Sequence, residues 1–142
     1  MRALLDVNVL LALFDADHSL HAAAMSWFDD NGKAGWATCP ITQNGCIRVM
    51  SQASYPNQAP IDVVAARLRE ATAHALHEFW PDSVSLLDGD GVDTKRIHGP
   101  RQLTDIYLLA LAVARGGRLV TFDKAVPLAA VPRAQKKHLV VI

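Results

Sequence analysis

Short hydrophobic runs recur along the chain and alternate with longer segments whose apolar residues have helical spacing. Runs of this length predict buried β-strands, whereas the longer segments predict amphipathic helices. We expect strands at residues 2–5, 35–39, 83–87, 118–122 and 139–142. We expect helices at residues 7–14, 20–29, 42–50, 61–79 and 103–114. Strands separated by helices predict an α/β protein, a three-layer α/β/α fold with a central, mainly parallel five-stranded sheet.

Length and composition place this pattern in one globular domain. The chain has 142 residues, of which 51% are hydrophobic and 20% charged, so we expect a single domain over residues 1–142. No apolar run approaches the roughly 18 residues of a membrane span, and Asp6 interrupts the first run before a signal sequence could form. Cys39 and Cys46 are too few for a disulfide framework. These observations favour a reduced, cytoplasmic protein without membrane association.

Charges are unevenly distributed along the chain. Residues 1–90 carry 5 basic and 11 acidic side chains, whereas residues 91–142 carry 9 basic and 3 acidic side chains. The formal net charge of the whole chain is zero, which argues against indiscriminate binding of nucleic acid. A basic face formed by the second part would attract a polyanion. The alternative is that the two groups of charges mix in space once the chain folds.

Three aspartates occupy positions that a parallel sheet brings to one edge. Asp6 directly follows the first predicted strand, Asp123 follows the fourth, and Asp105 lies in the first turn of the helix between residues 103 and 114. Each alone has an ordinary alternative in a turn or at a helix start. Together they would repel one another unless a cation compensates them. Oxygen ligands of this kind favour Mg²⁺ or Mn²⁺, so we expect a metal site beyond the strand ends.

Two neutral polar residues stand close to these acids in the sequence. Asn8 lies two residues after Asp6, where it would orient that carboxylate or a metal-bound water, or else cap the following helix. Thr121 lies two residues before Asp123 and would project toward the same edge. We treat both as auxiliary candidates for the site.

Two pairs of histidines have a spacing that can place both rings on one face of a helix. His18 and His21 form one pair, and His74 and His77 form the other. No third ligand has a matching spacing, so we expect surface or capping roles for them and no metal site.

Four segments resemble the signature blocks of PIN-domain proteins. They are Leu4–Leu10, Trp36–Gly45, Leu103–Ala110 and Leu119–Asp123, in this order along the chain. The sequence is most similar to the VapC toxins of bacterial type II toxin–antitoxin systems, and the likeness covers essentially all residues. The resemblance implies a PIN-like fold, a ribonuclease that depends on Mg²⁺ or Mn²⁺, a cognate VapB-type antitoxin that blocks the site, and a homodimer.

The resemblance also assigns the site residues one by one. The first, third and fourth acids of the family correspond to Asp6, Asp105 and Asp123. The usual second acid, a glutamate, corresponds to Gln43. An amide offers a carbonyl oxygen but no charge, so this departure weakens the attraction for metal and puts a second ion in doubt.

The expected reaction is hydrolysis of an RNA phosphodiester bond by a metal-activated water. It would leave a 5′-phosphate and a 3′-hydroxyl. Basic residues of the second part of the chain are the candidates for contacts with the RNA backbone. These candidates are Lys95, Arg96 and Arg101, with Arg118 and Lys124 expected near the last acid.

Two other functions remain open at this point. A catalytically silent PIN fold would bind RNA or the antitoxin without cleavage, because Gln43 replaces an acid. More remotely, Asp6-Val7-Asn8-Val9 resembles the motif of haloacid-dehalogenase-like phosphatases. Asn8 stands where those enzymes have a second aspartate as general acid, so such a phosphatase would be impaired.

Overall fold

The computed structural model describes all 142 residues and contains five strands and five α-helices. The strands are β1 (Ala3–Leu5), β2 (Trp36–Thr38), β3 (His77–Phe79), β4 (Arg118–Thr121) and β5 (Leu139–Val141). The α-helices are α1 (Val7–Phe14), α2 (His21–Asn31), α3 (Pro40–Met50), α4 (Ile61–Thr72) and α5 (Leu103–Ala114). Short 3₁₀-helices are η1 (Gly32–Ala34), η2 (Thr94–Arg96), η3 (Pro100–Gln102), η4 (Leu128–Ala130) and η5 (Lys136–His138).

All neighbouring strands of the sheet are parallel, in the order β3-β2-β1-β4-β5. The central strand β1 pairs Ala3 with Trp36 of β2 on one side and with Arg118 of β4 on the other. The chain first extends the sheet from β1 toward β3, and later adds β4 and β5 on the opposite side. The direction of winding therefore reverses between β1 and β4. The predicted five-stranded parallel sheet is confirmed.

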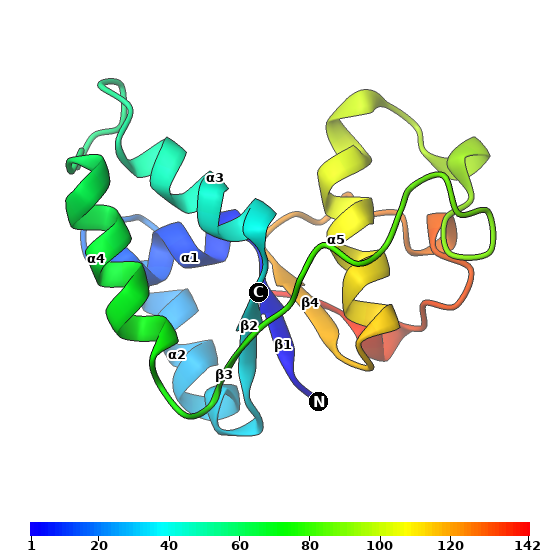
Figure 1. The fold of residues 1–142 in the computed structure, drawn as a ribbon, viewed down its shortest axis with the longest axis horizontal. Coiled ribbons are helices and arrows are strands. Elements are labelled where there is room, and N and C mark those ends of the chain that lie inside the picture. The colour runs from blue at the N-terminus through cyan, green and yellow to red at the C-terminus, as the bar shows by residue number, and fades with distance from the viewer.

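The two faces of the sheet are covered by different parts of the chain. Figure 1 shows α1 to α4 gathered on one side and α5 with its surrounding segments on the other. Successive side chains of a strand point to opposite faces. Ala3 and Leu5 therefore join the core beneath α1 to α4, while Leu4 joins the core beneath α5. Cys46 and Cys39 are free, buried members of these two cores.

The third strand lies elsewhere than predicted. Helix α4 ends at Thr72, and β3 follows at His77–Phe79, within the range that we expected to be helical. The segment 83–87 pairs with no strand, so its prediction is wrong. Its alternating Val84 and Leu86 are half-buried against the core beneath α5. The alternation thus reflects an extended segment that turns one side toward the core and is not a strand of the sheet.

Other boundaries differ by a few residues. Helix α3 begins at Pro40 because proline suits the first turn of a helix. The Oγ1 of Thr42 also accepts a 2.9 Å hydrogen bond from the backbone N–H of Cys39, which fixes this start. Helix α5 has the predicted bounds. None of the helices combines the length and apolar character that crossing a bilayer requires.

Candidate active site

The site lies where the sheet reverses its direction of winding. Leu5 of β1 pairs with Val120 of β4, so Asp6 and Thr121 emerge at the same level of the sheet. The backbone N–H of Asp6 donates to the carbonyl of Val120 at 3.0 Å, which carries the pairing to the strand end. Ligands of open parallel sheets bind beyond the carboxyl ends at such a reversal.

The hydroxyl of Thr121 connects the residues of this edge. It donates to Oδ2 of Asp6 at 2.7 Å, and it accepts from Nδ2 of Asn8 at 3.2 Å and from the backbone N–H of Asp123 at 3.0 Å. Thr121 is fully buried, so the three bonds hold one geometry. The other oxygen of Asp6 accepts a 2.7 Å bond from the backbone N–H of Val7. Both oxygens of Asp6 are thereby oriented, with Thr121 as the central partner.

Asn8 ties the start of α1 to the end of β4. Besides its bond to Thr121, its Oδ1 accepts a 3.4 Å bond from the backbone N–H of Phe122. The residue that caps α1 is Asp6, because its side chain accepts from Val7. The capping alternative for Asn8 is therefore wrong, and Asn8 acts on Asp6 through Thr121.

Asp105 reaches the same edge from the first turn of α5. Burial, the charge of Asp6, and the hydrogen bond and charge of Asp123 raise the pKa of Asp105 to about 7. Burial also raises the pKa of Asp6, against the lowering effect of its bonds to Thr121 and Val7, and the charge of Asp123 adds to the rise. Three carboxyl groups from distant parts of the sequence therefore act on one another at one place.

No cationic side chain compensates these three acids. The ion pairs of the molecule join Arg2 to Glu78 and Arg96 to Asp93. Asp6 is buried, and Asp105 and Asp123 are half-buried. Carboxylate oxygens without a counter-charge are the donors that Mg²⁺ prefers. The acids do not form a ready-made cage, because no three His, Cys, Asp or Glu side chains converge closely enough to hold a metal. This arrangement fits an ion that keeps several water ligands, as Mg²⁺ does.

Gln43 lies in the first part of α3 and contacts Thr38 at the end of β2. Its Nε2 donates to Oγ1 of Thr38 at 2.9 Å. The same hydroxyl lies 2.8 Å from Nε2 of His77, on the neighbouring strand β3. The sequence alone indicates no role for Thr38 and predicts a surface or capping role for His77, because the strand that carries His77 has no hydrophobic pattern. The structure joins both to a candidate site residue.

The basic candidates fall into two groups. Lys95, Arg96, Arg101 and Lys124 are exposed. Arg101 lies in η3 directly before α5, and Lys124 follows Asp123. Arg118 is at the amino end of β4, remote along the strand from Thr121. Its guanidinium lies 5.5 Å from the ring centre of Trp27 and 3.4 Å from Oδ1 of Asn31. Its placement near the last acid is therefore wrong.

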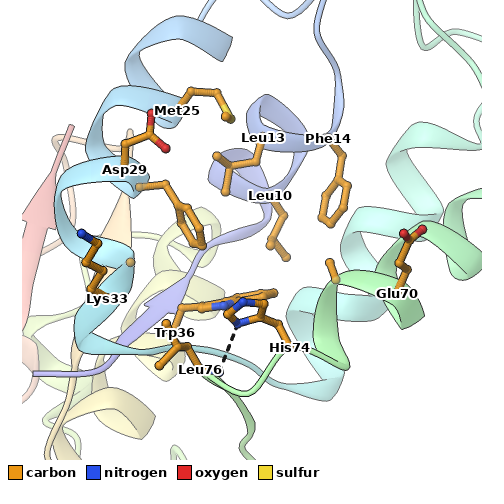
Figure 2. A pocket seen from close by; sticks show the side chains of 13 residues that line it. Leu10, Leu13, Phe14, Met25, Asp29, Lys33, Trp36, Glu70, His74 and Leu76 are labelled. Atoms are coloured by element: carbon orange, nitrogen blue, oxygen red, sulfur yellow. Dashed lines mark hydrogen bonds between the residues drawn. The ribbon is translucent and has the colours of Figure 1, made fainter.

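An apolar pocket opens away from the carboxylates. Its volume is about 460 Å³, and α1, α2, β2 and α4 contribute most of its lining. Figure 2 shows Leu10, Leu13 and Phe14 facing it from α1, opposite Trp36. None of the three candidate acids lines it. The pocket can take an apolar group and has no catalytic constellation.

Comparisons with known proteins agree on the family. The sequence profile of the PIN domain matches residues 3–133. The chain is 53% identical over 139 residues to Ribonuclease VapC44 of Mycobacterium tuberculosis, which covers 98% of both chains. It is 47% identical over 126 residues to Ribonuclease VapC39 of the same species, which covers 88% of this chain and 91% of that one.

Solved structures share the fold at low sequence identity. A VapBC2 structure from Rickettsia felis, bound to a promoter DNA fragment, matches with a TM-score of 0.63 and 15% identity over 100% of this chain and 98% of that one. Mycobacterium tuberculosis VapC20, a toxin that cleaves the sarcin-ricin loop, matches with a TM-score of 0.61 and 11% identity over 91% and 95%. With the profile match and the identities to VapC44 and VapC39, these findings show that the chain belongs to the PIN-domain family and, within it, to the VapC ribonucleases.

Proposed function

We propose that this chain is the toxin of a toxin–antitoxin pair and cleaves RNA as a Mg²⁺-dependent endoribonuclease. The observation that carries the proposal is the meeting of Asp6, Asp105 and Asp123 at one sheet edge without a compensating cation. Similarity to proteins named ribonuclease supports the reaction class. A phosphatase is disfavoured, because Asn8 is bound to Thr121 and Phe122 and cannot act as a carboxylic acid.

The three aspartates would hold the ion, and Mn²⁺ would substitute for Mg²⁺. When bound, the ion neutralises charge on the phosphodiester and lowers the pKa of the attacking water. Thr121 and the backbone of Val7 keep the Asp6 carboxylate in one orientation. Asp105 and Asp123 come from different segments, so their separation depends on how α5 packs against the turn after β4.

The side chain of Gln102 forms hydrogen bonds to the segment before α5 and to the turn after β4. Its Nε2 donates to the carbonyl of Ala125 at 3.2 Å, and its Oε1 accepts from the backbone N–H of His98 at 3.0 Å. Ala125 in turn donates its N–H to Oδ1 of Asp123 at 2.7 Å. The side chain of Gln102 therefore links the approach to α5 with the turn that positions Asp123.

RNA would approach the sheet edge along the exposed cations. Lys124 and Arg101 stand next to elements that carry candidate acids, and Lys95 and Arg96 extend this side of the molecule. Arg96 also pairs with Asp93 at 3.2 Å, which leaves it less free for phosphate than the other three. Contacts of this type favour the RNA backbone without reading its sequence.

The proposed protein partners are a VapB-type antitoxin and a second copy of the chain. A structural neighbour is a VapBC structure, and the apolar pocket lined by α1, α2 and α4 offers an antitoxin the apolar surface that a helix or extended segment needs. Ala71→Glu places a charge in this pocket and should weaken capture of the antitoxin, while RNA cleavage by the free chain persists. Sedimentation of the free chain measures whether two copies associate.

The central test compares RNA cleavage by the unaltered chain with that by Asp6→Asn and Asp105→Asn. We expect cleavage with Mg²⁺, no cleavage in EDTA, and loss of cleavage in both variants. Asp30→Asn is the matched control, because Asp30 is an exposed acid on α2 whose side chain takes part in neither ion pair. Full activity of either site variant, or activity in EDTA, would refute the proposal.

A silent binding module is the second candidate. The observations that favour it are Gln43 in place of an acid and the lack of a closed metal cage. It predicts tight binding of RNA with no products at any concentration of Mg²⁺ or Mn²⁺. Appearance of new 5′-phosphate ends, sensitive to Asp105→Asn, would eliminate it.

A further inference from the structure

We propose that Thr38 and His77 hold the amide of Gln43 with its carbonyl oxygen free toward the sheet edge, so that Gln43 serves as a neutral oxygen donor where the family resemblance implies an acid. This inference rests on the proposed metal-dependent function and adds to it a positioning pair. Neither Thr38 nor His77 would touch metal or RNA. Their effect would pass through the orientation of one amide group.

The three side chains form an unbroken chain of hydrogen bonds across β2, β3 and α3. Nε2 of Gln43 lies 2.9 Å from Oγ1 of Thr38, and Oγ1 lies 2.8 Å from Nε2 of His77. Thr38 is fully buried, so its hydroxyl has no alternative in solvent. No group of the chain donates to Oε1 of Gln43. That oxygen remains available for a ligand.

His77 decides the direction in which this chain of bonds runs. Its ring packs edge-on against Trp36, with ring centres 4.6 Å apart. A neutral ring that donates from one nitrogen must accept at the other. In the tautomer that carries its proton on Nδ1, Nε2 accepts from the hydroxyl of Thr38. Thr38 then accepts from Gln43, which requires the Nε2 of the amide there and turns Oε1 away.

Burial supports the neutral ring, because it lowers the pKa of His77. The backbone of Thr72 opposes this lowering, Arg2 adds to it, and Glu78 opposes it. Arg2 and Glu78 form an ion pair with each other at 2.9 Å. A neutral ring can accept at Nε2, which the proposed direction of the bonds requires.

The start of α3 lies beside the first candidate acid. Leu4 pairs with Ala37, so the ends of β1 and β2 reach the same level of the sheet. A Cβ placed on Gly45 of α3 would come within 2.6 Å of Cγ2 of Val7, the residue after Asp6. Helices α1 and α3 therefore meet in direct contact at the carboxyl edge. Gln43 is on the part of α3 that borders this edge.

A purely structural role for the pair predicts different behaviour. If Thr38 and His77 only satisfied one another inside the sheet, their loss would lower stability without changing the affinity of the folded protein for metal. If they position Gln43, loss of the Thr38 hydroxyl would matter only while Gln43 is present. A double-mutant cycle separates the two cases.

The experiment measures binding of Mn²⁺ alone, from the decrease of the free-ion electron paramagnetic resonance signal. Variants are Thr38→Val, Gln43→Ala, their combination, and Thr38→Ser, which keeps the hydroxyl. We expect Thr38→Val and Gln43→Ala each to weaken affinity about 10-fold, the double variant to match Gln43→Ala, and Thr38→Ser to retain tight binding. Thermal unfolding confirms that each variant is folded at the temperature of the assay.

Three outcomes would overturn the inference. Unchanged affinity in folded Thr38→Val would do so, as would equal weakening by Thr38→Val in the Gln43→Ala background. In both cases, if Asp105→Asn no longer binds Mn²⁺, the proposed metal-dependent function still holds. Failure of the unaltered chain to bind Mn²⁺ would instead refute the metal-dependent function, and the inference with it.

Nitrogen-15 NMR of the unaltered, metal-free chain gives a readout that needs no variant. We expect Nδ1 of His77 to be protonated and Nε2 unprotonated at neutral pH, with the amide protons of Gln43 protected from exchange. A protonated Nε2 would reverse the chain of bonds, direct the Gln43 oxygen toward Thr38, and contradict the inference.

Discussion

Two aspartates of this molecule, Asp15 and Asp105, stand in opposite chemical environments. Asp15 follows α1 and is 5% exposed. It accepts bonds from the hydroxyl of Tyr55 at 2.6 Å, from Nδ2 of Asn57 at 2.9 Å, and from the backbone N–H of Asp17 at 3.0 Å. The hydrogen bonds from Asn57 and Tyr55 contribute most to holding the pKa of Asp15 below its usual value.

Asp105 is surrounded by acids where Asp15 is surrounded by donors. Its pKa rises to about 7, first from burial and then from Asp6 and Asp123. A carboxylate whose two oxygens both accept hydrogen bonds stabilises the fold, and in this chain Asp15 connects the loop after α3 to the end of α1. A carboxylate kept beside other carboxylates costs stability, and is retained where a ligand supplies the missing charge. Asp15 is therefore a structural acid, whereas Asp105 is the proposed metal ligand.

The largest expected effect comes from Asp105→Asn. Cleavage of RNA should fall by about 100- to 1000-fold, because an oxygen donor for the ion loses its charge. The melting temperature of the metal-free protein should rise at neutral pH, because repulsion with Asp6 and Asp123 is relieved. Gel assays and calorimetry in EDTA measure the two. A melting temperature that falls in the folded variant would contradict the contrast drawn with Asp15.

Asp15→Ala should lower the stability of the protein, whereas Asp105→Asn should raise it. The free energy of unfolding should fall by about 3 kcal/mol, because Tyr55 and Asn57 lose a charged acceptor. Urea unfolding measures the change. The matched control is Asp17→Ala, which removes an exposed acid with a longer, 3.3 Å bond to Asn57 and should cost under about 0.5 kcal/mol. RNA cleavage by folded Asp15→Ala should remain, since Asp15 lies outside the sheet edge.

Tyr55→Phe makes a smaller change to the same cluster and carries a pH signature. Loss of the hydroxyl should cost about 1.5 kcal/mol near neutral pH. Because the pKa of Asp15 is lowered by folding, its contribution is present above the unfolded value of about 4 and is lost as the pH falls through the folded value. Urea unfolding across this range should show the two proteins converging in acid. A constant difference would assign the effect to packing.

The smallest expected effect is that of Gln102→Ala. Cleavage should fall roughly fivefold, the equivalent of about 1 kcal/mol, because the segments carrying Asp105 and Asp123 lose a fastening. Thermal unfolding should change little, since Gln102 is only half-buried. Gln102→Glu serves as a control that keeps the acceptor for His98 but removes the donor to Ala125. Equal cleavage by Gln102→Ala and the unaltered chain would show that this link does not position the acids.

Much of the fold follows from local patterns that need no knowledge of tertiary contacts. The bounds of α5 follow from its apolar residues and the two glycines after Ala114. Strands β1 and β4 are apolar runs that end at acids. Because parallel strands end at the same edge of a sheet, the positions of Asp6 and Asp123 predict that both lie at this edge, and the pairing of β1 with β4 makes them neighbours.

The remaining features depend on long-range packing. β3 has half-buried or exposed side chains, so its three residues carry no hydrophobic signal. His77 consequently could not be placed beside Thr38 before the strand itself was located. The prediction for Arg118 was wrong for a different reason. Arg118 and Asp123 are close in the sequence, but the extended strand β4 places them at opposite ends.

All five strands run in one direction, and this has a practical consequence for handling the protein. Met1 lies just before β1, and the Gly116–Gly117 turn just before β4, so both are at the end of the sheet opposite the acids. Gly117 is closely packed, since a Cβ there would meet the carbonyl of Arg2 at 2.6 Å, whereas Gly116 has open space around it. A fluorophore or affinity tag attached ahead of Met1 would label the molecule without obstructing the edge that carries the candidate acids.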